Sequence, residues 1–251
     1  MKKFKGLIFF LIGIMIISIL NFDNVEEVFE LNSSKNNIET KTINKSNKYI
    51  EASMKIPVLV IQNKEIENII NKKIEKDIMD FYNNSYKEAE SYFDDFPDAE
   101  MQFVVNSEFE VKKNNEQVIS LLVKYYKYSG GAHGNYEYVP YNIDLTSGKF
   151  FQLNDIFKAN SNYKQIINEE ITKQIKELNI KNQLPEDSDQ LYLFKEIKDN
   201  QKFYLGQNSI VIFFDLYEIA PYVAGIPEFS ISRDILEDII EDAYKNKIFN
   251  N

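Results

Sequence analysis

The only imidazole in the chain is His133, and it lies in a glycine-rich run four residues after Ser129. Serine, histidine and an orienting acid can together form a nucleophilic relay. However, no GxSxG elbow surrounds Ser129, and no GK[ST] sequence follows to complete a phosphate-binding loop. We therefore expect His133 to cap or hydrogen-bond the turn, and predict that His133→Ala costs about 1–3 kcal/mol of stability.

Six carboxylates between residues 88 and 100 offer oxygen ligands of the kind that Ca²⁺ prefers. Their spacing is not that of an EF-hand loop, so a solvated acidic face is the interpretation we favour. No pair of carboxylates is placed by the sequence to flank a glycosidic bond. One histidine and no cysteine exclude most zinc sites and all disulfides. The sequence therefore predicts no metal, no cofactor and no enzymatic activity, with an unrecognised enzyme as the remaining alternative.

The most distinctive run is the loop Tyr217–Phe229, which contains two prolines and a glycine. Rigid, tyrosine-rich loops bind proteins at low entropic cost. The alternative is that the aromatic side chains fill the core beneath the loop, and the sequence does not decide between the two. The candidate ligand contacts come from this loop and the glycine-rich run: Ser129, Gly130, Gly131, His133, Pro221, Tyr222 and Pro227.

Charge narrows the class of partner. Among 251 residues, 29 are Lys or Arg and 39 are Asp or Glu, for a net charge of −10. Such a body repels nucleic acids and attracts cationic partners. The single arginine, Arg233, further weakens the case for nucleic-acid recognition, which relies on bidentate arginine contacts.

The N-terminus predicts export. Three lysines among the first five residues precede an uncharged run over residues 6–20. We interpret residues 1–22 as a signal peptide or an uncleaved signal anchor, both of which place the rest outside the cytoplasm, secreted or anchored to the membrane by this helix. The polar stretch over residues 23–47 is expected to be a tether.

Hydrophobic periodicity predicts an α+β fold, with helices and antiparallel strands mixed and without βαβ regularity. Two small domains are expected, over residues 48–145 and 146–245. The first should hold a strand, a helix capped by Asn63, an acidic loop and a hairpin followed by one more strand. The expected elements are strands at 48–61, 103–111, 119–125, 136–145, 203–205, 210–214 and 229–231, helices at 63–86, 163–178 and 233–244, and a loop at 88–100.

Four ordered motifs resemble one known family: Ser129–Gly134, Asn142–Lys149, Leu153–Phe157 and Tyr217–Phe229. They are similar to the extracytoplasmic module that RsiV-type anti-sigma factors share with PdaC-type deacetylases. The resemblance covers about residues 48–245. It implies an N-terminal α+β domain, a smaller C-terminal α/β domain and an exported protein of a Gram-positive cell. In RsiV-type members it also implies lysozyme binding.

The sequence departs from both family branches. Only five residues precede the apolar run, so we expect no cytoplasmic segment able to hold a sigma factor. One histidine cannot make the metal site of a deacetylase domain. We therefore expect a cell-envelope binding module whose ligand is a cationic protein such as lysozyme, with a peptidoglycan or other cell-wall glycan as the alternative.

Overall fold

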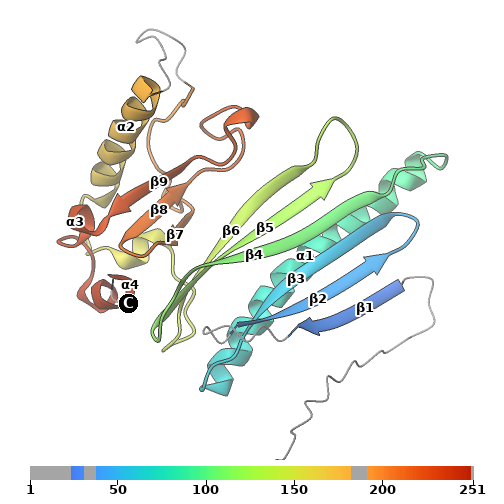
Figure 1. Cartoon of the computed structure of the whole chain (residues 1–251), viewed down its shortest axis with the longest axis horizontal. Coiled ribbons are helices and arrows are strands. Elements are labelled where there is room, and N and C mark those ends of the chain that lie inside the picture. The colour runs from blue at the N-terminus through green and yellow to red at the C-terminus, as the bar shows by residue number, and fades with distance from the viewer. Residues whose placement is uncertain (1–23, 31–37, 182–190, 250–251) are drawn as a thin grey trace, which may run out of the picture.

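The computed structural model describes residues 24–30, 38–181 and 191–249. The predicted export segment, residues 1–22, lies outside these ranges. Within them, no helix combines the length and the hydropathy that crossing a bilayer requires. The fold is α+β, as the sequence predicted, with one large sheet that packs against a long helix and a smaller sheet with further helices beside it (Figure 1).

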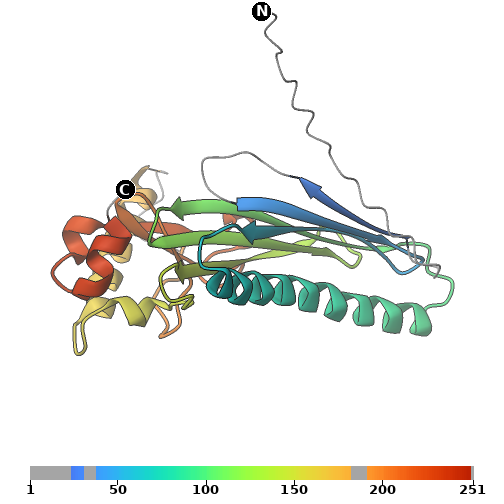
Figure 2. The same ribbon diagram turned by 90° about the horizontal axis from the view of Figure 1, so that it is seen from below.

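The large sheet has the strand order β1-β2-β3-β4-β5-β6. The long helix α1 follows one face of this sheet, and the other face carries no helix of the described residues alongside β3, β4 and β5 (Figure 2). The bounds are β1 Asn24–Glu30, β2 Ile38–Ser46, β3 Ile50–Leu59, α1 Lys64–Asp95, β4 Phe103–Asn114, β5 Val118–Tyr128 and β6 Asn135–Asp144.

Helix α1 begins where the sequence predicted, because the Asn63 side chain accepts hydrogen bonds from the backbone N–H groups of Glu65 and Ile66. Isoleucines at helical spacing, including Ile70, Ile74 and Ile78, are fully buried against the sheet. Residues on alternate positions of β3, such as Met54, are buried opposite them. This contact forms the core of the N-terminal domain.

The acidic loop expected at residues 88–100 is wrong over its first half, since α1 continues to Asp95 and ends at a cap on Phe96. The helical face persists through Ala89, which is fully buried, and Tyr92. The carboxylates occupy the exposed side of the last turns. Pro97 then prevents the helix from continuing.

The expected tether at residues 23–47 is also wrong. Residues 24–30 and 38–46 form β1 and β2, and β2 pairs with β3 from Ile38 opposite Leu59 to Ser46 opposite Glu51. Only a few apolar side chains of β2, Ile38 and Ile43, are buried. A strand with so little buried surface reads as polar linker in the sequence.

One βαβ unit is present, contrary to the expected absence of this motif. Strands β3 and β4 are parallel, with Ile50 opposite Phe103, and α1 makes the crossover between them. The remaining neighbours are antiparallel, including the predicted β4–β5 hairpin. Pro140 lies in β6, at the edge of the sheet, which agrees with its lack of an N–H donor.

The C-terminal domain has a three-stranded antiparallel sheet of order β7-β8-β9, and the predicted β7–β8 pairing is present. The helix expected at 233–244 is two shorter helices, because the chain between them forms a bridge from Ile240 to Phe157. The bounds are η1 Leu153–Ile156, α2 Tyr163–Lys181, β7 Phe203–Leu205, β8 Ser209–Phe213, η2 Tyr222–Ala224, β9 Glu228–Ser232, α3 Arg233–Leu236 and α4 Asp242–Phe249.

Candidate functional site

Two loops that the sequence singled out separately meet in the structure. The turn between β5 and β6 carries His133, and the loop between β8 and β9 carries Tyr222. Their rings are stacked, with centroids 4.2 Å apart and an interplanar angle of 23°. The Tyr222 hydroxyl also donates to the carbonyl of Gly134 at 3.3 Å. One loop comes from each domain, so the contact lies at one end of the junction between the domains.

The shape of the first loop depends on glycine. Gly130 and Gly131 have φ of 102° and 93°, a region that other residues rarely adopt. The Tyr128 hydroxyl donates to the Gly131 carbonyl at 3.0 Å and closes the turn. Gly134 is needed for a different reason, since a Cβ there would lie 2.5 Å from Cζ of Tyr126. The turn therefore rests on the Tyr126 ring.

The second loop presents side chains to solvent at the point where it approaches the first. Tyr217 is 62% exposed and Val223 is 87% exposed. The Tyr217 ring lies 5.7 Å from that of Tyr222, and Tyr217 has a φ of 64°, a strained value for a tyrosine. Residues held in strained conformations concentrate at functional sites. We call the exposed set the junction surface: Ser129, Gly130, Gly131, His133, Tyr217, Pro221, Tyr222 and Val223.

The sequence left open whether the aromatic loop forms a binding surface or packs into the core. The structure divides the loop between the two, because residues near its C-terminal end are buried. Phe229 is 1% exposed and packs edge-on against Phe214. Pro227 is buried, and its carbonyl accepts from the N–H of Phe214 at 3.1 Å. Pro227 was a candidate ligand contact, and its burial removes it from the surface.

His133 is exposed, so its hydrogen bond is not the buried one on which the predicted cost of His133→Ala was based. Its Nδ1 lies 3.1 Å from the carbonyl oxygen of Gly134, within the same turn. Among the described residues, neither Ser129 nor a carboxylate is hydrogen-bonded to the ring. The arrangement of a nucleophilic relay is therefore not formed in this part of the chain.

The acidic end of α1 lies beside the junction surface. A Cβ on Gly130 would be 3.3 Å from Cε of Met101, so the residue that follows the acidic stretch packs against the turn. Asp95, Asp98 and Glu100 are exposed, and within the described ranges none of them pairs with a lysine. No group of three or more described His, Asp or Glu side chains is arranged to hold a metal ion. The carboxylates instead give this flank a negative potential.

The opposite end of the junction is made of polar groups that the sequence analysis missed. Ser120 of β5 donates to the Asn142 side chain of β6 at 2.6 Å and accepts from the N–H of Leu205 at 3.0 Å. The Asn142 amide donates to the carbonyl of Phe203 at 2.9 Å. Ser120 and Asn142 are buried, and both partners on the other side belong to β7. The sequence does contain a signal for this contact, since Ser120 and Asn142 are polar residues within largely apolar strands.

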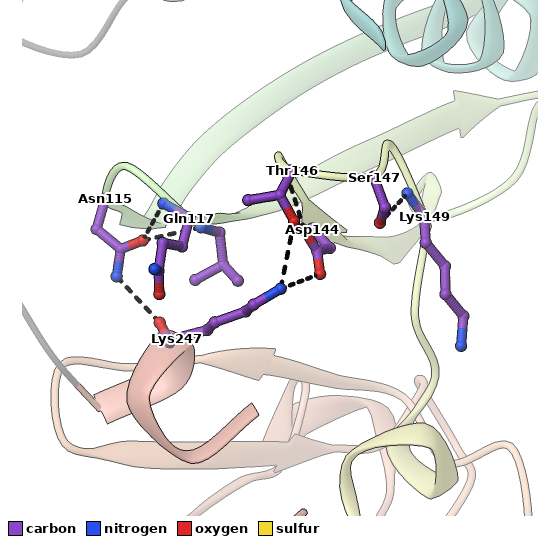
Figure 3. Close-up of polar contacts among 8 residues, drawn as sticks. Asn115, Gln117, Asp144, Thr146, Ser147, Lys149 and Lys247 are labelled. Atoms are coloured by element: carbon purple, nitrogen blue, oxygen red, sulfur yellow. Dashed lines mark hydrogen bonds and ion pairs between the residues drawn. The ribbon is translucent and has the colours of Figure 1, made fainter. Parts of the chain in front are cut away.

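An ion pair lies beside this relay (Figure 3). Lys247 of α4 binds Asp144 at the end of β6 at 2.6 Å, and Thr146 donates twice to the same carboxylate. The Lys247 carbonyl accepts from the Asn115 amide at 3.0 Å. Burial alone would raise the pKa of Asp144, but the Lys247 ammonium and the Thr146 hydrogen bonds outweigh it and lower that pKa. We call these groups, Ser120, Asn142, Asp144 and Lys247 with their partners, the junction base.

A further set of ionisable groups, apart from the domain junction, lies between the large sheet and α1. Burial raises the pKa of Tyr125 to about 12, and it also raises the pKa of Tyr141. The two hydroxyls are 3.3 Å apart, and Tyr141 donates to Asp77 of α1 at 3.1 Å. Both phenols stay protonated at neutral pH, so the hydrogen bonds from Tyr125 through Tyr141 to Asp77 link α1 to the sheet.

The architecture is that of two solved proteins of the DUF3298 family. One, from Bacteroides fragilis, superposes with a TM-score of 0.60 at 18% identity and covers 91% of this chain and 96% of that one. The other, from Pseudomonas aeruginosa, has a TM-score of 0.61 at 16% identity and covers 91% and 95%. These likenesses establish the fold of the whole two-domain body.

Family models divide the chain in the same way. The model described as deacetylase PdaC matches residues 43–136, and the one described as a protein of unknown function, DUF3298, matches residues 154–234. The two matches follow one another in the order that the four motifs indicated, and they confirm the resemblance to the shared module.

Two curated proteins of Bacillus subtilis strain 168 are similar to it. The peptidoglycan-N-acetylmuramic acid deacetylase PdaC is 24% identical over 236 residues, covering 92% of this chain and 48% of that protein. The anti-sigma-V factor RsiV is 25% identical over 197 residues, covering 74% and 64%. The chain thus spans about half of the first relative and less than two thirds of the second.

Proposed function

We propose that this protein is a non-catalytic binding module on the outer side of the cell membrane, and that the junction surface binds a basic protein such as a lysozyme. The observation that carries the proposal is the stack of His133 on Tyr222. It joins exposed loops of both domains into one surface beside carboxylates that have no lysine partner in the described residues.

Charge supports a cationic ligand. The chain carries a net charge of −10, and Asp95, Asp98 and Glu100 add a local concentration of negative charge next to the turn. Complementary fields raise the rate of encounter and are screened by salt. The association rate should therefore fall as ionic strength rises, while the dissociation rate changes less.

The aromatic side chains support a protein ligand. Tyr222 is half-buried between His133, Tyr136 and Tyr217, so its ring is already fixed before binding. An ordered ring loses little entropy at an interface, and tyrosine is enriched among residues that dominate binding energy. Val223 and Tyr217 extend the same surface with apolar area that is exposed in the free protein.

The relatives support the location and the class. The PdaC relative is named for action on peptidoglycan, and RsiV is named as an anti-sigma factor. A Lys-flanked apolar run at residues 6–20 fits export of the body that follows it. Deacetylation and sigma-factor control belong to relatives that are longer than the region shared with this chain, and we assign neither to it.

The test is calorimetric titration of the full-length protein, in a mild detergent, with a basic lysozyme at low and at physiological ionic strength. We expect binding that weakens with salt, and a loss of about 2 kcal/mol for Tyr222→Ala, as for an interface hot spot. Ile180→Ala is the control, because it removes an exposed apolar side chain from α2, outside the junction surface.

Absence of binding at both ionic strengths would reject the proposal and favour a glycan as the ligand. Binding that Tyr222→Ala and Val223→Ala leave unchanged would retain the partner and reject the junction surface. Thermal unfolding of each variant distinguishes a lost contact from a lost fold.

A further inference from the structure

The face of the large sheet opposite α1 has a hollow of about 320 Å³ over β3, β4 and β5. It lies at the small end of the volume range of ligand sites. Strand register places its lining side chains in two rows that cross the strands. Ser53 lies opposite Asn106, which lies opposite Tyr126, and this row is neutral. Glu108 lies opposite Lys124 and pairs with Lys55 at 3.4 Å, and this row is charged.

Three groups in the hollow have hydrogen-bonding capacity left over. Within the described residues, the Asn106 amide and the Tyr126 hydroxyl make no hydrogen bond, and Lys124 pairs with no carboxylate. The Lys124 ammonium lies 4.8 Å from the centroid of the Tyr136 ring, which holds it by a cation–π contact. An amide and a phenol without hydrogen-bond partners therefore share one side of the sheet with an ammonium that has no carboxylate partner.

The charge of the hollow is opposite to that of the protein. Its two lysines outnumber its one glutamate, whereas the chain as a whole carries −10. A ligand that bears a carboxylate would meet an attractive ammonium here and repulsive carboxylates at the end of α1. Charge complementarity thus separates this site from the junction surface.

We propose that the hollow binds one saccharide unit that carries a carboxylate. The carboxylate would pair with Lys124, and ring hydroxyl or amide groups of the sugar would bond to Asn106 and to the Tyr126 hydroxyl. Saccharides suit a shallow polar site because they present many donors and acceptors and little apolar surface. The contact between Gly134 and the Tyr126 ring restricts the orientation of that ring. This proposal does not depend on lysozyme binding.

The test is an NMR titration of the full-length protein in detergent with two sugars that differ in one group. N-acetylmuramic acid carries a lactyl carboxylate, and N-acetylglucosamine lacks it. We expect N-acetylmuramic acid to bind more tightly, and Lys124→Gln to weaken it by about tenfold, the effect of losing one charged hydrogen bond. Tyr126→Phe should weaken both sugars while keeping the ring that supports Gly134.

Lys87→Gln is the matched control, because it removes the same charge from an exposed position on α1. It should leave both affinities unchanged. Equal affinities for the two sugars, or no binding of either, would overturn the proposal. Lactate that binds as tightly as N-acetylmuramic acid would also overturn it, since the site would then recognise an anion and not a sugar.

Discussion

The two ends of the domain junction differ in the kind of contact that joins the domains: buried polar groups at one end and aromatic rings at the surface at the other. At the junction base, buried groups of the first domain bind partners in the second: Asn142 donates to the Phe203 carbonyl, and Asp144 pairs with Lys247. At the junction surface, the exposed ring of His133 stacks on the half-buried ring of Tyr222 without enclosing a core. Buried polar groups are costly to leave unpaired, whereas exposed rings lose little when separated. The difference indicates that the base fixes the relative position of the domains and leaves the surface available for a ligand.

The largest effect on this comparison should come from Asn142→Ala. The substitution leaves the Phe203 carbonyl and the Ser120 hydroxyl without their partner in a buried site. We expect a loss of about 3 kcal/mol in the free energy of unfolding, measured by denaturant titration. Asn106→Ala, on an accessible face, is the control and should change little. A loss below about 1 kcal/mol for Asn142→Ala would mean that the base does not fix the junction.

A smaller loss, about 2 kcal/mol at pH 7, is expected for Asp144→Asn. The pKa of Asp144 is lowered in the folded state, so its stabilising contribution is present above the unfolded pKa and is lost as the pH falls through the folded one. The difference in unfolding free energy between wild type and variant should therefore shrink as the pH falls below about 4, the ordinary pKa of an aspartate side chain. Asp98→Asn, at an exposed position, should show no such convergence. A pH-independent difference would contradict the ion pair with Lys247.

Gly134→Ala should cost about 1–2 kcal/mol, because the new methyl group overlaps the Tyr126 ring. Truncating that ring in a Gly134→Ala, Tyr126→Ala double variant should remove the overlap. The two substitutions are then non-additive in a double-mutant cycle of unfolding free energies. Additive losses would show that Tyr126 does not support the turn.

The smallest effects on the unfolding free energy are expected at the junction surface, where the proposed binding of a basic protein depends most on individual side chains. His133→Ala should lower the unfolding free energy by less than about 1 kcal/mol, since an exposed side chain loses one stacked ring, and Tyr222→Ala by about 1 kcal/mol, since a half-buried ring loses three ring contacts and one hydrogen bond. Thermal unfolding of both variants provides the measurement. Losses as large as that of Asn142→Ala would erase the distinction between the two ends of the junction.

Local patterns predicted much of this fold. Helix α1 and the β4–β5 hairpin follow from side-chain spacing, because each buries a continuous apolar face. Strand β2 does not follow, because its pairing with β3 supplies stability that its own side chains barely signal. The candidate contacts His133 and Tyr222 were found by residue type, yet their stacking depends on how two domains pack. The relay of Ser120 with Asn142 depends likewise on register between distant strands.

The position of β6 has a consequence for how such genes can be assembled. The PdaC match ends at residue 136 and the DUF3298 match begins at residue 154, while β6 runs from Asn135 to Asp144. Asn142 and Asp144 therefore lie in the interval between the two matches, and both bond to the second domain. A recombination that transferred one matched segment alone would omit Asn142 and would leave Ser120 or Phe203 without this partner. The two segments should therefore be inherited together, with β6 between them.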